Sequence, residues 1–239
     1  MIWDDASVTK YKEYDNSELR YIHPILLEML GEVQRKKIID YGCGEGKFLE
    51  ELLQRGAEIY GYDISEAMIA QSRKRVGISG ELAVTESGKI PLPDNSVDGA
   101  VSNLVLMMCG SVQTVDAIFK EVGRVLKPQS PFVFCITHPA FTDRIFTTYR
   151  NIFPRNWSYS NEGQPYQFVL RREDGTEITH ETFVDHHYPL STYFNVLVQN
   201  NFLVTGVREL VIPGNDYPPY LVVKSTPLKT TSPPTERRD

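Results

Sequence analysis

Three alternate glycines stand where an apolar segment meets the start of an expected helix. The segment Ile38-Ile39-Asp40-Tyr41 leads directly into Gly42-Cys43-Gly44-Glu45-Gly46. Glycines let the backbone turn tightly and let a ligand approach without obstruction from a Cβ atom. The start of the following helix adds unpaired N–H groups and a partial positive charge. This combination predicts a loop that binds a nucleotide or a nucleoside.

The spacing of the glycines distinguishes between these two ligands. Dinucleotide-binding loops follow the pattern GxGxxG, in which the third glycine comes three residues after the second. Here the third glycine is Gly46, and Lys47 stands where the dinucleotide pattern requires glycine. Asp63 ends the next apolar segment, where a carboxylate can accept both hydroxyls of a ribose. The pattern therefore favours a nucleoside without a pyrophosphate.

Histidine is the first side chain to consider for removing a proton near neutral pH. His138 follows an expected strand and His187 precedes an expected helix, and these two are the predicted candidate bases. His186 should face away from His187, because successive residues of an extended chain point to opposite sides. The same geometry makes the pair a poor chelate, and we predict no metal site. His23 and His180 fit a catalytic role less well.

An alternation of strand and helix patterns would position these residues. The expected strands cover 37–41, 58–62, 82–84, 98–105, 131–137, 202–211 and 220–223, and the expected helices cover 45–55, 65–76, 112–126 and 191–200. This order predicts an α/β fold with a doubly wound, mostly parallel, seven-stranded Rossmann-like sheet and helices on both faces. In such a sheet, ligands bind at the carboxyl ends of the strands.

The sequence resembles the class I S-adenosylmethionine-dependent methyltransferases, and it is similar in style to the small-molecule branch that includes the quinone-biosynthesis enzymes. The resemblance is carried by VQRKKIIDYGCGEGKFLEELLQRGAEIYGYDISEAMI and continues in KIPLPDNSVDGAVSNLVL and EVGRVLKPQSPFVFCITHP. It covers about residues 1–138 and, through HHYPLSTYFNVLVQNNF, part of the remainder. It implies S-adenosyl-L-methionine as the cofactor and in-line transfer of its methyl group to a small molecule.

Carried over by position, the resemblance implies a role in cofactor binding for residues of several segments. These are Asp40, Gly42, Cys43, Gly44 and Gly46 around the methionine part, Asp63 at the ribose, Ile64 and Met68 beside the adenine, Glu86 and Ser87 near its amino group, Asn103 and Leu104 along the methyl-transfer cleft, and Tyr11 closing over the cofactor. Two positions depart from the family pattern. Glu86-Ser87 replaces the usual Asp-Ala, and Met108 stands where many relatives carry a histidine.

Residues 139–188 interrupt the alternation of strands and helices and are rich in aromatic side chains. Expected strands at 167–172 and 176–184 are joined through Asp174–Gly175, a hairpin turn signal. We interpret this insertion as an acceptor-binding lid, with a passive surface elaboration as the alternative. The residues predicted to bind an aromatic or lipophilic acceptor are Tyr14, His138, Phe141, Tyr149, Trp157 and His187.

The remaining parts are an N-terminal helical lid segment at 1–30, a cofactor-binding core at 31–138, the end of the core at 189–224 and a tail at 225–239, which is expected to be disordered. The net charge is −6, and Arg73–Lys74–Arg75 is the most basic cluster, so we expect no nucleic-acid partner. Neither a signal peptide nor a membrane span is apparent, and we expect a cytoplasmic location.

Three other functions stay open at this point. A nicotinamide-dependent oxidoreductase would share the fold, although Lys47 disfavours it. A cofactor-binding protein without catalysis would keep the glycine loop and lack a base. A methyltransferase acting on protein or RNA, including tRNA, is disfavoured by the acidic charge and the aromatic insertion.

Overall fold

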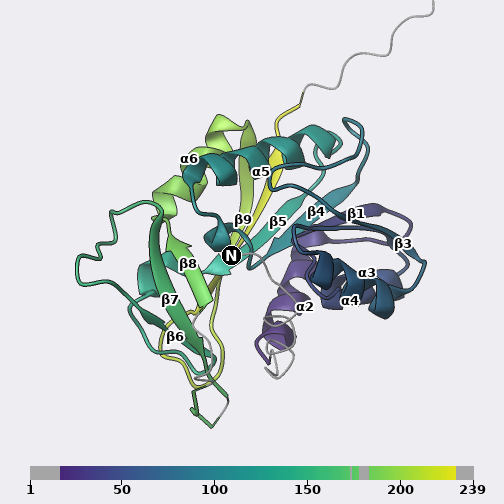
Figure 1. Cartoon of the computed structure of the whole chain (residues 1–239). Coiled ribbons are helices and arrows are strands. Elements are labelled where there is room, and N and C mark those ends of the chain that lie inside the picture. The colour runs from purple at the N-terminus through teal and green to yellow at the C-terminus, as the bar shows by residue number, and fades with distance from the viewer. Residues whose placement is uncertain (1–16, 173, 178–182, 230–239) are drawn as a thin grey trace, which may run out of the picture.

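The computed structural model describes residues 17–172, 174–177 and 183–229, and its centre is a seven-stranded sheet in the order β3-β2-β1-β4-β5-β10-β9 (Figure 1). Strands β1 to β5 pair in parallel, whereas β10 runs antiparallel to β5 and β9. The strands are β1 (Lys37–Tyr41), β2 (Glu58–Asp63), β3 (Gly80–Val84), β4 (Gly99–Asn103), β5 (Phe132–Thr137), β9 (Phe202–Leu210) and β10 (Tyr220–Pro227). The predicted doubly wound, mostly parallel α/β fold is confirmed.

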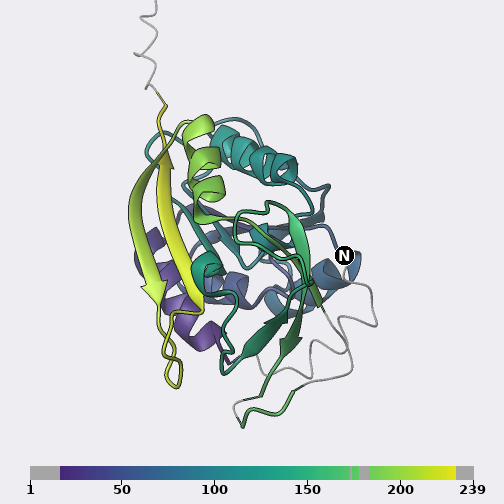
Figure 2. The same ribbon diagram turned by 90° about the vertical axis from the view of Figure 1, so that its left-hand side faces the viewer.

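Helices cover both faces of this sheet (Figures 1 and 2). One face carries α2 (Leu19–Leu30), α3 (Lys47–Gln54) and α4 (Glu66–Val76). The other carries α5 (Val112–Val125) and α6 (Leu190–Gln199). Two short 3-10 helices, η1 (Leu106–Met108) and η2 (Pro139–Phe141), follow β4 and β5.

The spacing of apolar residues explains how the helices pack. In α5 the buried residues recur every three or four positions, which places them on one stripe of the helix. Phe119 from this stripe lies edge-on against Phe132 and Phe134 of β5. Ser65 and Ser111 start α4 and α5, and each Oγ accepts a hydrogen bond from a backbone N–H of the first turn.

A second, three-stranded antiparallel sheet lies within the insertion, in the order β6-β7-β8. Its strands are β6 (Tyr149–Ile152), β7 (Gln164–Leu170) and β8 (Phe183–His187). The predicted turn at Asp174–Gly175 is present, because Gly175 N donates to Arg172 O at 2.8 Å. The pattern did not predict β6, since its four residues show no alternation of buried and exposed positions.

The helix α2 falls inside the segment that we expected to act as an N-terminal lid. Its residues Ile22 and Leu26 are fully buried against the sheet, so α2 is a core helix. Tyr11, Tyr14 and His180 lie outside the described residues, as does the tail beyond Lys229.

Candidate functional site

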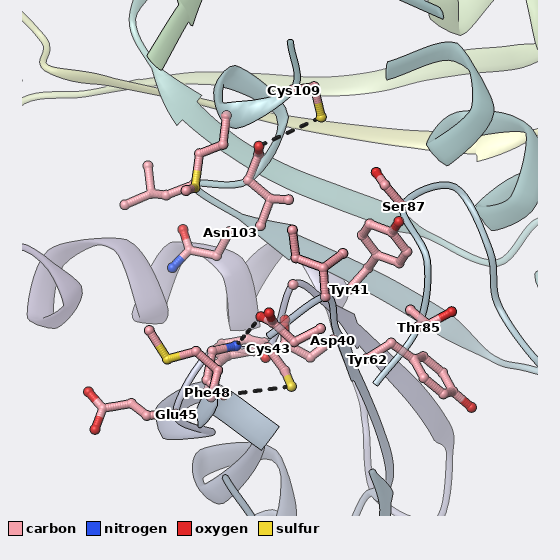
Figure 3. Close-up of a pocket in the computed structure, with 18 of the residues that line it drawn as sticks. Asp40, Tyr41, Cys43, Glu45, Phe48, Tyr62, Thr85, Ser87, Asn103 and Cys109 are labelled. Atoms are coloured by element: carbon pink, nitrogen blue, oxygen red, sulfur yellow. Dashed lines mark hydrogen bonds between the residues drawn. The ribbon is translucent and has the colours of Figure 1, made fainter. Parts of the chain in front are cut away.

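A cavity of about 340 Å³ opens where the carboxyl ends of β1, β2 and β4 meet (Figure 3). The parallel pairing of β1 with both β2 and β4 brings these three strand ends together. Ten of the residues predicted to bind the cofactor line the cavity: Asp40, Gly42, Cys43, Gly44, Asp63, Ile64, Met68, Ser87, Asn103 and Leu104. Two predicted residues, Gly46 and Glu86, do not line it.

The three glycines of the loop serve different purposes. All three have a positive φ, which disfavours any side chain. A Cβ on Gly42 would overlap the side chain of Val105, and one on Gly46 would press against Ser72. A Cβ on Gly44 would meet no atom within 4 Å, because Gly44 borders open space in the cavity. Packing therefore requires glycine at 42 and 46, whereas at 44 the free space is available to a ligand.

Asp63 holds the glycine loop against the end of β2. Its Oδ2 accepts a hydrogen bond from Gly44 N at 3.0 Å, and its Oδ1 accepts one from Ser65 N at 2.9 Å. Burial raises the pKa of Asp63, and the backbone hydrogen bonds act in the opposite direction. Each oxygen retains a lone pair for a further donor, such as a hydroxyl group of a ligand.

Two buried oxygens in the cavity wall have no hydrogen-bond partner among the described residues. They are Asp40 Oδ1 and Asn103 Oδ1, from the neighbouring strands β1 and β4. Burial, followed by the charge of Asp63, raises the pKa of Asp40 to about 7. Because an unpartnered buried acceptor is costly, the pair is suited to a ligand that brings N–H donors.

A short loop after β3 forms another wall of the cavity. Thr85 and Ser87 line it, whereas Glu86 between them does not. The chain turns here, because Lys89 N donates to Glu86 O at 3.1 Å. Gly88 N donates to the hydroxyl of Tyr41 at 2.6 Å, which ties the loop to the end of β1. Ile64 and Met68 line the same cavity.

The exit of β4 forms the apolar end of the cavity. Leu104 has a φ of 57°, an uncommon conformation for a residue with a branched side chain. Backbone strain of this kind often occurs at binding and catalytic sites. Val105, Met108 and Cys109 follow Leu104 along the cavity wall, and Thr114 from α5 adds a hydroxyl.

Neither predicted base lies on this cavity. His138 is buried with its Nε2 3.0 Å from Glu209 Oε1, and its Nδ1 accepts a hydrogen bond from Ala140 N at the start of η2. His187 is buried with its Nε2 2.8 Å from Tyr159 O. Both rings are thus held by polar partners elsewhere in the fold, and burial lowers the pKa of each imidazole.

His186, rather than His187, approaches the cavity. Its Nε2 lies 3.7 Å from the position that a Cβ on Gly110 would take, and Gly110 lines the cavity. Its Nδ1 is buried without a hydrogen-bond partner among the described residues. The two histidines do face opposite sides of β8, but the side that approaches the cavity is that of His186.

The predicted acceptor-binding aromatic residues also pack away from the cavity. Phe141 stacks on His138, and the hydroxyl of Tyr149 donates to Pro219 O at 2.9 Å. Trp157 packs against Phe153 in the connection between β6 and β7. These contacts fix the position of the second sheet beside the main one.

Sequence reasoning missed the contribution of α2 and α3 to the cavity. Leu19 and His23 of α2 and Lys47 and Phe48 of α3 line it. His23 precedes Pro24 in the expected N-terminal lid segment, and both residues lie inside the core helix α2. The apolar spacing of α2 was the available signal, since its buried residues form one face of an amphipathic helix.

Comparisons with known proteins agree with this geometry. Residues 39–134 match a family model described as a methyltransferase domain. The biotin biosynthesis bifunctional protein BioHC of Cellvibrio japonicus is 32% identical over 43% of this chain and 20% of its own length. A malonyl-[acyl-carrier protein] O-methyltransferase of Hamiltonella defensa is 28% identical over 41% and 38%, respectively. The chain thus spans well under half the length of these two relatives.

Longer alignments cover most of the chain. A demethylmenaquinone methyltransferase of Tropheryma whipplei is 28% identical over 66% of this chain and 67% of its own length. The crystal structure of an S-adenosylmethionine-dependent methyltransferase from Mesorhizobium loti is 28% identical, covers 85% of this chain and 96% of its own, and has a TM-score of 0.65. A structure from Listeria monocytogenes, 22% identical with a TM-score of 0.67, shares the fold.

Two features are absent from the described residues. No helix in them is both long and apolar enough to span a membrane. No group of three or more His, Cys, Asp or Glu side chains within them is arranged to hold a metal ion.

Proposed function

The chain belongs to the class I S-adenosylmethionine-dependent methyltransferases, and we propose that it transfers the cofactor's methyl group to a small, aromatic or lipophilic molecule. The pair of unpartnered acceptors, Asp40 Oδ1 and Asn103 Oδ1, carries the proposal. An ammonium group offers N–H donors to both oxygens, and its charge offsets that of a buried carboxylate. S-adenosylmethionine carries such a group at its methionine end, so the residues present fit this cofactor.

The rest of the cavity suits the nucleoside part of the same molecule. Asp63 has lone pairs left for the ribose hydroxyls. Ile64 and Met68 offer apolar contact to the adenine, and the hydroxyls of Thr85 and Ser87 can bond its edge. The open space beside Gly44 leaves room for the backbone of the methionine part.

The protein's share of the reaction is to align the reactants and exclude water. The cofactor supplies a methyl group on a sulfonium centre, which is already activated for displacement. Holding two reactants in the reactive geometry can contribute about 7–11 kcal/mol. Leu104, Val105 and Met108 form an apolar wall that keeps water away from that end of the cavity. A general base is not required for every acceptor.

The acceptor side of the proposal rests on the apolar end of the cavity. We retain residues 139–188 as the proposed acceptor-binding insertion, because β8 packs against η1, which contributes Met108 to the cavity wall. The relatives named demethylmenaquinone methyltransferase and malonyl-[acyl-carrier protein] O-methyltransferase suggest two acceptor classes, a quinol ring and an acyl carboxylate.

The free thiols of Cys43, Cys109 and Cys135 favour the cytoplasm as the proposed location.

A thermal-shift panel followed by a transfer assay tests the function. S-adenosylhomocysteine should raise the melting temperature and NAD should not, and the reverse result would exclude the methyltransferase in favour of an oxidoreductase. Transfer of a labelled methyl group is then measured to a quinol, a malonyl thioester and bulk tRNA. Binding without transfer to any small molecule would favour the cofactor-binding alternative, and transfer to tRNA would refute the small-molecule acceptor.

A further inference from the structure

A buried histidine beside the cavity is paired with a half-buried glutamate at the interface between α2 and α3. His23 Nδ1 lies 2.6 Å from Glu51 Oε1, and the histidine side chain is only 6% exposed. The ring of Phe48 meets the imidazole edge-on, with ring centroids 5.0 Å apart. The imidazole is thus held in one orientation by a carboxylate and an aromatic ring, and Nε2 remains for another partner.

His23 lines the same cavity as the unpartnered acceptors Asp40 Oδ1 and Asn103 Oδ1. Lys47 adds a second basic group to the cavity, and it is paired with Glu45 at 2.8 Å. The α3 helix begins at Lys47, so its N-terminal N–H groups add partial positive charge there. The cavity therefore has one wall with unpartnered acceptors and another where a histidine, a lysine and helix N–H groups can donate.

This arrangement, with acceptors on one wall and donors on the other, matches a zwitterionic ligand. The methionine end of S-adenosylmethionine has an ammonium and a carboxylate on the same carbon. When the ammonium is bound by the acceptor wall, the carboxylate needs a donor. Burial lowers the pKa of the His23 imidazole in the free protein, whereas Glu51 and a bound ligand carboxylate both favour its protonated form. Because Nδ1–H donates to Glu51, Nε2 can donate to the ligand carboxylate only when the ring takes up a second proton on binding.

We propose that His23, positioned by Glu51, donates a hydrogen bond from Nε2 to the carboxylate of the cofactor's methionine part. His23 is then a specificity-determining residue, because it favours ligands with a complete amino-acid end over nucleosides that lack the carboxylate. This inference rests on the proposed function, since it assumes that the cavity binds S-adenosylmethionine.

Calorimetry with two ligands that differ by one group tests it. S-adenosylmethionine and its decarboxylated form share the sulfonium, the amine and the nucleoside. Removing a hydrogen bond to a charged group costs about 10- to 100-fold in affinity. His23→Ala should weaken binding of S-adenosylmethionine by that factor and change binding of the decarboxylated form less than twofold. Glu51→Gln should show the same pattern with a smaller loss.

Two further variants control for structural damage. His23→Gln retains an N–H donor and should recover part of the affinity for S-adenosylmethionine. Glu28 lies on the same helix as His23 and forms an exposed ion pair with Arg208 of β9. Glu28→Gln should bind both ligands like the wild type. Equal losses for the two ligands in His23→Ala, or no loss for either, would overturn the role of His23. If the wild type binds neither ligand, the proposed function itself fails.

Discussion

Replacing Gly44 by alanine separates the binding role of the glycine loop from its structural role. Gly44 has a φ of 52°, and its added methyl group would meet no protein atom. The cost to stability is therefore that of a left-handed residue alone, about 1–2 kcal/mol. In a chain of this size that corresponds to a fall of about 2–8 °C in melting temperature.

Gly42→Ala is the matched comparison two residues away. Gly42 has a φ of 78°, and its added methyl group would overlap the side chain of Val105. Overpacking adds about 1–3 kcal/mol to the backbone cost. Gly42→Ala should therefore be the less stable of the two variants in urea unfolding, although the substitution is chemically the same.

Cofactor binding should rank the same two variants differently. The methyl group in Gly44→Ala occupies space that the ligand is proposed to fill, so its affinity for S-adenosylhomocysteine should fall at least about tenfold, or about 1.4 kcal/mol. Calorimetry at a temperature where the variant is folded measures this loss. Wild-type affinity in Gly44→Ala would refute the assignment of this loop to the cofactor, and equal destabilisation of both variants would refute the packing argument.

Three other substitutions give separate tests. Asp63→Ala removes the acceptor for Gly44 N and Ser65 N, and it should weaken S-adenosylhomocysteine binding about 10- to 100-fold by calorimetry. Burial raises the pKa of Asp185 to about 7, so its stabilising contribution is full below about pH 4 and is lost as the pH rises towards 7. Asp185→Asn should remove this part of the pH dependence in urea unfolding between pH 4 and 8, and an unchanged slope would contradict it. Phe119→Ala should cost about 3–5 kcal/mol in the same assay, because Phe119 is fully buried among Phe132, Phe134 and Phe202.

The cofactor side of the site was predictable because its residues sit at defined places in a regular fold. A parallel sheet brings its strand ends together, so Asp40, Asp63 and Asn103 had to share one edge once the strands were identified. The GxGxG spacing placed Gly44 at a turn with a positive φ. In the loop after β3, Ser87 lines the cavity as expected, whereas Glu86 does not and Thr85 does.

The contribution of α2 needed tertiary information. His23 and Glu51 are 28 positions apart and belong to different helices, and no local pattern connects them. Periodicity indicates that one face of α2 is buried, but not which neighbouring helix it meets. The segment 1–30 was expected to be a helical lid, yet α2 contains Pro24 and packs across the sheet.

In the second sheet, the alternation of residues along a strand predicts only part of the arrangement at the acceptor side. A period of two dictates that His186 and His187 face opposite sides of β8, and the structure agrees. It does not dictate which side approaches the cavity, because that depends on how β8 docks against η1. The His186 ring lies beside Gly110 in the cavity wall, while His187 is held by Tyr159 O. A one-residue shift in the docking of β8 would exchange the two roles.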